Sequence, residues 1–259
     1  MVRRALSIKP AATGAFIVLA VSLAVGLSVA NGGTALQAHR HCSGLPQLAE
    51  TVHLKPADFS ANIDNAQWPM TVGSRWVYRV LDYSNGSVKH EVITVTKHTR
   101  MMGDGIRARV ISDVVTEHGN PSEVTKDWYA QDKHGNVWYF GEHTIEYVNG
   151  HPRDNGSWRA GVDGAMPGVA LPANPKVGCS YREEYAKGIA QDQSRVLALD
   201  GQAQVPAGHF APALMNEDFS PIEPDVSEIK YYAKGSGQAV LAVDASGGTD
   251  MEQLVKYTH

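Results

Sequence analysis

Alternating apolar and polar residues dominate the chain from about residue 73 onward, and this pattern predicts β-strands. Residues 75–83 read RWVYRVLDY and are followed by Asn85-Gly86, a dipeptide typical of tight β-hairpins. Residues 88–98 then return as the partner strand. In residues 106–116 the apolar positions recur every second residue rather than every 3.6 residues, which indicates a strand and not a helix.

Further short strands follow to the end of the chain, each bounded by Gly, Pro, Asp or Ser. With about eleven strands and no helical segments between them, the pattern predicts a mainly antiparallel all-β fold. We expect a meander that is closed or partly closed into a barrel or half-barrel. The additional predicted strands are 124–132, 137–143, 181–188, 195–199, 213–219, 228–233, 238–244 and 251–257.

An apolar segment at residues 15–30 follows Arg3, Arg4 and Lys9 and has the features of an export signal. It is shorter than the roughly 20 apolar residues of a spanning helix, and small residues at its end offer cleavage sites near Ala30 or Ala35. We therefore expect a cleaved signal peptide, a secreted or periplasmic protein, and no stable membrane insertion after cleavage.

The domain organisation follows from these patterns. Residues 1–30 form the predicted signal peptide, 31–72 an irregular N-terminal segment and 73–259 a single β-rich domain. Within this domain, residues 149–178 are rich in Gly and Pro and lack alternation, so they are expected to form one long loop.

Composition and charge narrow the range of partners. The chain has 43% hydrophobic and 19% charged residues, which is ordinary for a globular protein. Its net charge of −4 becomes −7 once the three basic residues of the first thirty are removed. An acidic domain without a Lys/Arg cluster argues against nucleic acid as a partner.

The two cysteines, Cys42 and Cys179, both lie in the exported part. In an oxidising compartment an even pair predicts a disulfide. The alternative is a metal site formed by His39, His41 and Cys42, whose donor types suit a soft metal such as copper or zinc.

The most distinctive run is DWYAQDKHGNVWYFGE at residues 127–142, in which a Trp-Tyr pair occurs twice. If Asp132 pairs with Val137 across the turn, Tyr129 lies opposite Phe140 and Asp127 lies opposite Glu142. Such paired carboxylates can share a proton, hold a divalent metal or catalyse glycoside hydrolysis. The alternative is an ordinary sheet held by aromatic pairs, with its carboxylates in water.

Two further carboxylates are candidates for the same chemistry. Asp163 lies in the Gly-rich run SWRAGVDGAMPG, together with Trp158, and glycines there allow close approach to a ligand. Glu184, in YREEYAKG, needs a partner such as Arg159 or a bound cation if it faces inward. The candidate catalytic residues are therefore Asp127, Glu142, Asp163 and Glu184, and the candidate ligand contacts are Trp128, Tyr129, Trp138, Tyr139 and Trp158.

The motif at residues 127–142 resembles one in a family of exported bacterial proteins of uncharacterised activity. The resemblance continues in GSWRAGVDGAMPG, YREEYAKGIAQD and KYYAKGSG and covers most of the chain after Val72. It implies export from a bacterial cell but assigns no activity and no catalytic residue. At the level of fold alone, the chain is also similar to periplasmic half-barrel carriers.

These observations favour a secreted or periplasmic binding protein that holds a small or amphipathic ligand in an aromatic-lined barrel. The chain carries no nucleophile elbow, P-loop, dinucleotide-binding or C-x-x-C motif, and this favours a non-enzymatic role. Two alternatives stay open. One is an extracytoplasmic hydrolase using paired carboxylates, with or without a divalent metal, and the other is a structural envelope protein.

Overall fold

The computed structural model describes residues 40–248 and 250–259. The predicted signal peptide, both predicted cleavage sites and His39 therefore lie outside the described residues. Within the described part, the chain is almost entirely antiparallel β-structure, with one short 3-10 helix, η1 (Pro56–Asp58). The predicted all-β fold is confirmed.

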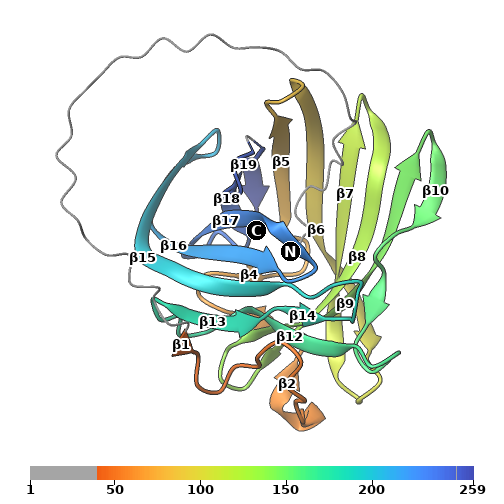
Figure 1. The fold of residues 1–259 in the computed structure, drawn as a ribbon, viewed down its shortest axis with the longest axis vertical. Coiled ribbons are helices and arrows are strands. Elements are labelled where there is room, and N and C mark those ends of the chain that lie inside the picture. The colour runs from red at the N-terminus through yellow and green to blue at the C-terminus, as the bar shows by residue number, and fades with distance from the viewer. Residues whose placement is uncertain (1–39, 249) are drawn as a thin grey trace.

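A meander of five long strands forms one side of the molecule (Figure 1). Each strand pairs with the next, and the predicted Asn-Gly turn joins the first two. Tight turning there requires Gly86, which has a φ of 74°. The five strands are β5 (Arg75–Asp82), β6 (Ser87–Met101), β7 (Arg107–Glu117), β8 (Asn120–Asp132) and β9 (Val137–Val148).

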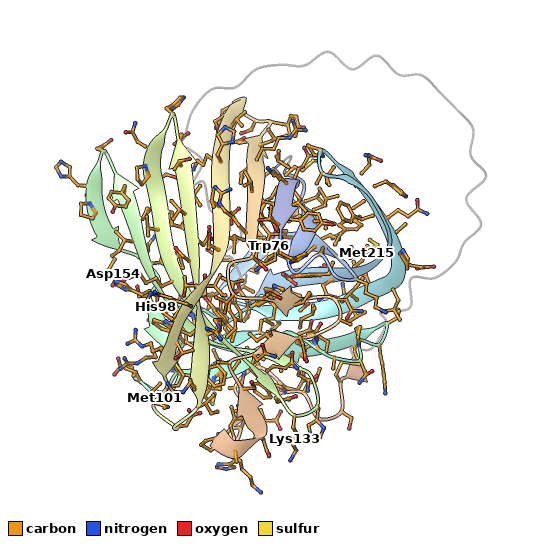
Figure 2. All side chains as sticks on the ribbon, turned by 180° about the vertical axis from the view of Figure 1, so that it is seen from behind. Trp76, His98, Met101, Lys133, Asp154 and Met215 are labelled. Atoms are coloured by element: carbon orange, nitrogen blue, oxygen red, sulfur yellow. A yellow bond between two sulfur atoms is a disulfide. The ribbon has the colours of Figure 1, made fainter. Side chains whose placement is uncertain are left out.

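A second meander forms the other side and returns to the first, because its last strand pairs with β5. Trp76 and Tyr78, on the inward-facing positions of β5, lie in the core between the two sides, and Figure 2 labels Trp76 there. The second meander consists of β15 (Gln193–Val205), β16 (Gly208–Ser220), β17 (Glu223–Ala233), β18 (Ala239–Asp244) and β19 (Met251–Thr258).

Residues 149–178 contain three strands that all pair with β9. The prediction that these residues form one long loop is therefore wrong. These strands are β10 (His151–Asp154), β11 (Trp158–Arg159) and β12 (Met166–Leu171). Residues 167–171 of β12 are all buried. A strand buried on both faces shows no alternation, which is why the pattern did not reveal it.

The segment before residue 73 is also partly ordered in short strands. It contributes β1 (Arg40–His41), β2 (Phe59–Ser60), β3 (Ile63–Asp64) and β4 (Pro69–Met70). The first of these pairs in parallel with β13 (Cys179–Arg182), and Cys42 forms a disulfide with Cys179. The predicted disulfide is therefore present, and the Cys42 sulfur is not available as the third donor of the alternative metal set.

The barrel is nearly closed, with one unsealed seam between β12 and β13. Among the described residues no backbone ladder joins these two strands, although β12 pairs with the short β14 (Glu184–Tyr185). Arg182 spans the seam: its guanidinium is buried and donates to the carbonyl of Pro167 at 2.7 Å and to that of Leu48 at 2.6 Å. One side chain thus links β13 to β12 and to the N-terminal segment across the seam.

No helix in the described part of the chain is long and apolar enough to cross a membrane.

Candidate functional site

A β-bulge in the β8–β9 hairpin sets the geometry of the site. At the turn, Gln131 pairs with Val137 and Tyr129 with Tyr139, one residue away from the predicted register. Two residues of β9, Phe140 and Gly141, then lie opposite Trp128 alone, and this extra residue restores the predicted pairing of Asp127 with Glu142. The prediction for the two carboxylates is confirmed, whereas the predicted register at the turn is wrong.

The turn register differs because Asp132, the last residue of β8, closes the turn with its side chain and does not pair with Val137. Its carboxylate accepts hydrogen bonds from the backbone amides of His134 and Asn136, at 2.8 and 3.0 Å, and from the Trp138 indole at 2.8 Å. Aspartate readily closes turns in this way. The segment between the paired residues Gln131 and Val137 therefore spans residues 132–136 rather than the four residues expected.

Gly141 has a φ of 122°, a conformation that side chains rarely adopt. A Cβ at this position would collide with the backbone carbonyl oxygen of Trp158 on β11. The absence of a side chain lets β11 pair directly with β9, so that Trp158 lies opposite Glu142. One cross-strand row therefore carries Asp127, Glu142 and Trp158 on three adjacent strands.

The hydroxyl of Tyr139 joins the two carboxyl groups of this row. It lies 2.8 Å from Asp127 Oδ1 and 2.8 Å from Glu142 Oε2. A phenol has one hydrogen to donate, so it can donate to only one of two carboxylates. Both short contacts are favourable when one carboxyl is protonated and donates to the phenol oxygen.

Burial favours the protonated form of Glu142. Burial raises its pKa from the ordinary 4.5 to about 8, and the nearby charge of Asp127 raises it further in the same direction. A protonated Glu142 can donate to the Tyr139 oxygen while the phenol donates to Asp127 Oδ1, so both 2.8 Å contacts are satisfied. Burial also raises the pKa of Tyr139, so the phenol keeps its hydrogen.

Aromatic rings enclose this hydrogen-bonded set. Tyr139 stacks on Tyr129, with ring centroids 4.7 Å apart, and meets Trp158 edge-on at 5.4 Å. Both tyrosines are buried in the core. They position the carboxyl groups but present no surface to a ligand.

Glu184, another predicted site residue, is buried on the other side of Trp158. Its Oε2 accepts a hydrogen bond of 3.0 Å from the Trp158 indole. Burial and the charge of Asp192 raise the pKa of Glu184 well above its ordinary value. The partner suggested by the sequence, Arg159, is replaced here by a tryptophan.

A pocket of about 340 Å³ opens beside this set. Glu142 lines it together with Trp128 and Trp158, and Asp163 lies on its exposed rim. The remaining lining residues are Arg100, His143, Ser157, Arg159, Val162, Ala165, Ala186, Lys187 and Ile189.

The pocket therefore unites some of the predicted site residues and leaves others out. Trp128, Trp158, Glu142 and Asp163 line it, whereas Asp127 and Glu184 are buried outside its lining and accept hydrogen bonds from Tyr139 and Trp158. Tyr129 and Tyr139 lie in the core. Trp138 borders a different pocket, of about 410 Å³, near the N-terminal segment.

Several buried charged residues were not predicted from the sequence. Lys230 is buried and bonds to Asp218 at 2.7 Å and to Glu228 at 3.3 Å. Burial and the charge of Asp218 raise the pKa of Glu183 well above its ordinary value. Burial likewise raises the pKa of Asp192 to about 6. These residues line the interior next to Glu184 and extend the buried acidic region away from the pocket.

Within the described residues, no three His, Cys, Asp or Glu side chains are arranged to hold a metal ion. The side chain of His41 and all of His39 lie outside the described part, so the N-terminal metal hypothesis is left as a prediction.

No protein-family model matches this chain. No curated protein matches it either. Among solved structures, it is similar to a candidate lipoprotein from Parabacteroides distasonis, with a TM-score of 0.42 and 13% identity over 75% of this chain and 99% of the other. A candidate exported protein with a YmcC-like fold from Bacteroides fragilis matches with a TM-score of 0.42 and 12% identity, over 74% and 98%.

A third match, in the complex of MucA and MucB from Pseudomonas aeruginosa, has a TM-score of 0.35 and 10% identity, over 75% of this chain and 53% of that one. At TM-scores below 0.5, these likenesses support no conclusion about the function of this chain.

The raised pKa of Glu142 predicts a specific pH dependence of stability. A carboxyl whose pKa is higher in the folded than in the unfolded protein stabilises the fold fully below the unfolded value of 4.5. This contribution is lost as the pH rises toward about 8. Glu142→Gln, which cannot ionise, should therefore gain stability relative to the wild type by about 1 to 3 kcal/mol between pH 5 and pH 8.

Urea unfolding of both proteins across this pH range measures the difference directly. Asp225→Asn, at an exposed position of β17, is the control for removal of a carboxyl group. A difference between wild type and Glu142→Gln that does not change with pH would show that Glu142 is ionised in the fold.

Proposed function

We propose that this protein is an exported binding protein and that the pocket beside β9 holds a small or amphipathic ligand. The observation that carries the proposal is the meeting of Trp128, Trp158 and Glu142 at one pocket of about 340 Å³. Pockets of this size, with aromatic walls and a few placed polar groups, are typical small-molecule sites. The signal-like segment and the disulfide support export.

The position of this pocket refines the hypothesis drawn from the sequence. The barrel interior is filled by large side chains such as Trp68, Trp76 and Tyr78, which are almost fully buried. We therefore place the ligand at the β9–β11 edge of the barrel, against two of the five predicted aromatic contacts.

The pocket walls are rigid where they meet the ligand. Trp158 is fixed by its hydrogen bond to Glu184 and by its contact with Tyr139, and Glu142 is fixed by Tyr139. A site whose side chains are held in place before binding loses less conformational entropy when the ligand arrives.

Filling the pocket should remove the ligand. Val162 lines it and is 37% exposed, so Val162→Trp places a large side chain at the rim without disturbing the core. Val177→Trp, at a position that is 59% exposed and outside the pocket lining, is the matched control. We expect native mass spectrometry of protein purified from its own compartment to find the same bound small molecule on the wild type and Val177→Trp.

Val162→Trp should carry at least about ten-fold less of this molecule, because the added ring occupies its space. A wild-type protein that is purified empty, or a Val162→Trp variant that is loaded as fully as the wild type, would contradict the proposal.

One observation favours a second function, hydrolysis with acid catalysis. A protonated carboxyl in a pocket wall is the general acid of many glycoside hydrolases, and Asp163 on the rim supplies a second carboxylate. If this function holds, the wild type cleaves one member of a panel of chromogenic aryl glycosides and Glu142→Gln loses the activity by about a hundred-fold or more. Without turnover by the wild type, the binding function stands alone.

A further inference from the structure

The pocket is lined by three cationic side chains from three separate segments of the chain. Arg100 comes from the end of β6, Arg159 from β11, and Lys187 from the turn after β14. The whole chain has a net charge of −4, so a group of three cations around one pocket is a marked local departure from its average charge.

These cations have no carboxylate partner in the part of the chain that the structure describes. No salt bridge or side-chain hydrogen bond engages Arg159 or Lys187 there. Arg100 lies over the ring of Trp128, 4.2 Å from its centroid, and this contact leaves its charge unneutralised. All three guanidinium or ammonium groups are therefore available to an anion in the pocket.

The other charged groups of the lining do not cancel this excess. Glu142 is held in the hydrogen-bonded set of Tyr139 and Asp127, and no salt bridge among the described residues joins it to the three cations. His143 lies 3.6 Å from Asp154 and 3.2 Å from the Ser157 hydroxyl. Asp163 is the one exposed carboxylate among the lining residues. Even with Glu142 counted as ionised, the three cations outnumber the carboxylates.

Apolar side chains line the same pocket as these cations. Val162 and Ile189 line the pocket and are 37% and 39% exposed, and Ala165 and Ala186 are part of the same lining. Met101, which follows Arg100 at the end of β6 and is labelled in Figure 2, is 52% exposed. Exposed apolar side chains beside cations match a ligand that has an apolar body and a negatively charged group.

We propose that the ligand of this pocket is an anion with an apolar body, whose carboxylate or phosphate group is bound by Arg100, Arg159 and Lys187 and whose apolar part lies against Trp128, Val162 and Ile189. This inference rests on the proposed binding function. It adds the chemical class of the ligand, which the binding function alone leaves open.

The test compares four probes that share one eight-carbon chain and differ in the polar group. Octanoate and octyl phosphate are the anionic probes, octanol is the neutral one and octyltrimethylammonium is the cationic one. Isothermal titration of the mature chain at pH 7 should show the two anions binding at least about ten-fold more tightly than octanol and the cation more weakly still. Inorganic phosphate and acetate report the contribution of the charged group alone.

Charge-removing variants locate the binding. Arg159→Gln and Lys187→Gln, both at exposed positions, should each weaken octanoate binding by roughly three- to ten-fold and leave octanol binding unchanged. Arg75→Gln and Lys234→Gln remove exposed cations outside the pocket lining and are the matched controls. They should leave the binding of both probes unchanged.

The outcomes separate this inference from the proposed function. If octanol and octyltrimethylammonium bind as tightly as octanoate, and Val162→Trp abolishes all of this binding, the pocket binds ligands and the anionic class is wrong. If Arg75→Gln and Lys234→Gln weaken octanoate binding as much as the pocket variants do, the anion responds to the overall charge of the protein. The proposed set of three cations is then wrong. If no probe binds and the purified protein is empty, both the function and the ligand class are contradicted.

Discussion

One extra residue in strand β9, at Phe140–Gly141, sets the positions of the groups that form the candidate site. Without this bulge the register at the turn would carry through the hairpin, and Asp127 would no longer lie opposite Glu142. Without the glycine, a side chain would collide with the backbone of β11 and move Trp158 away from the same row. A local backbone feature thus determines both the hydrogen-bonded carboxyl pair and one aromatic wall of the pocket.

The barrel interior contains more acidic than basic side chains, and burial favours the neutral form of several of the acids. Glu142, Glu183 and Glu184 all have pKa values raised mainly by burial, so each favours its neutral form in the fold. Lys230 is also buried, but its ion pairs with Asp218 and Glu228 raise its pKa and favour its charged form. A neutral carboxyl group can donate a hydrogen bond as well as accept one, and Glu142 is placed for this beside the Tyr139 hydroxyl at the pocket wall.

Much of the fold could be predicted from the sequence, because strands with one buried and one exposed face show alternating apolar and polar residues. The strands of residues 149–178 could not be predicted, since β12 is buried on both faces and β10 and β11 are very short. The pairing of Asp127 with Glu142 was predicted correctly, although the turn was assigned the wrong length. A bulge that compensates for a turn leaves no clear trace in the pattern of residue types.

The buried carboxylates did leave a signal. Glu91 has the same strand parity as Ile93 and Val95, and Asp113 has that of Ile111 and Val115, so both acids occupy inward-facing positions. An acid at an apolar position of a strand is evidence for a polar interior. The three cations of the pocket, in contrast, come from segments that are distant in sequence, and only the folded chain brings them together.

The most direct test of this account is an NMR titration of the Glu142 carboxyl carbon in the wild type, Gly141→Ala and Gly161→Ala. Gly161 also has a positive φ, of 81°, but its Cβ would meet no atom, so Gly161→Ala reproduces the backbone strain without the collision. We expect a midpoint near 8 in the wild type and Gly161→Ala, and a shift toward 4.5 in Gly141→Ala. A wild-type midpoint near 4.5, or one that Gly141→Ala leaves unchanged, would contradict the account.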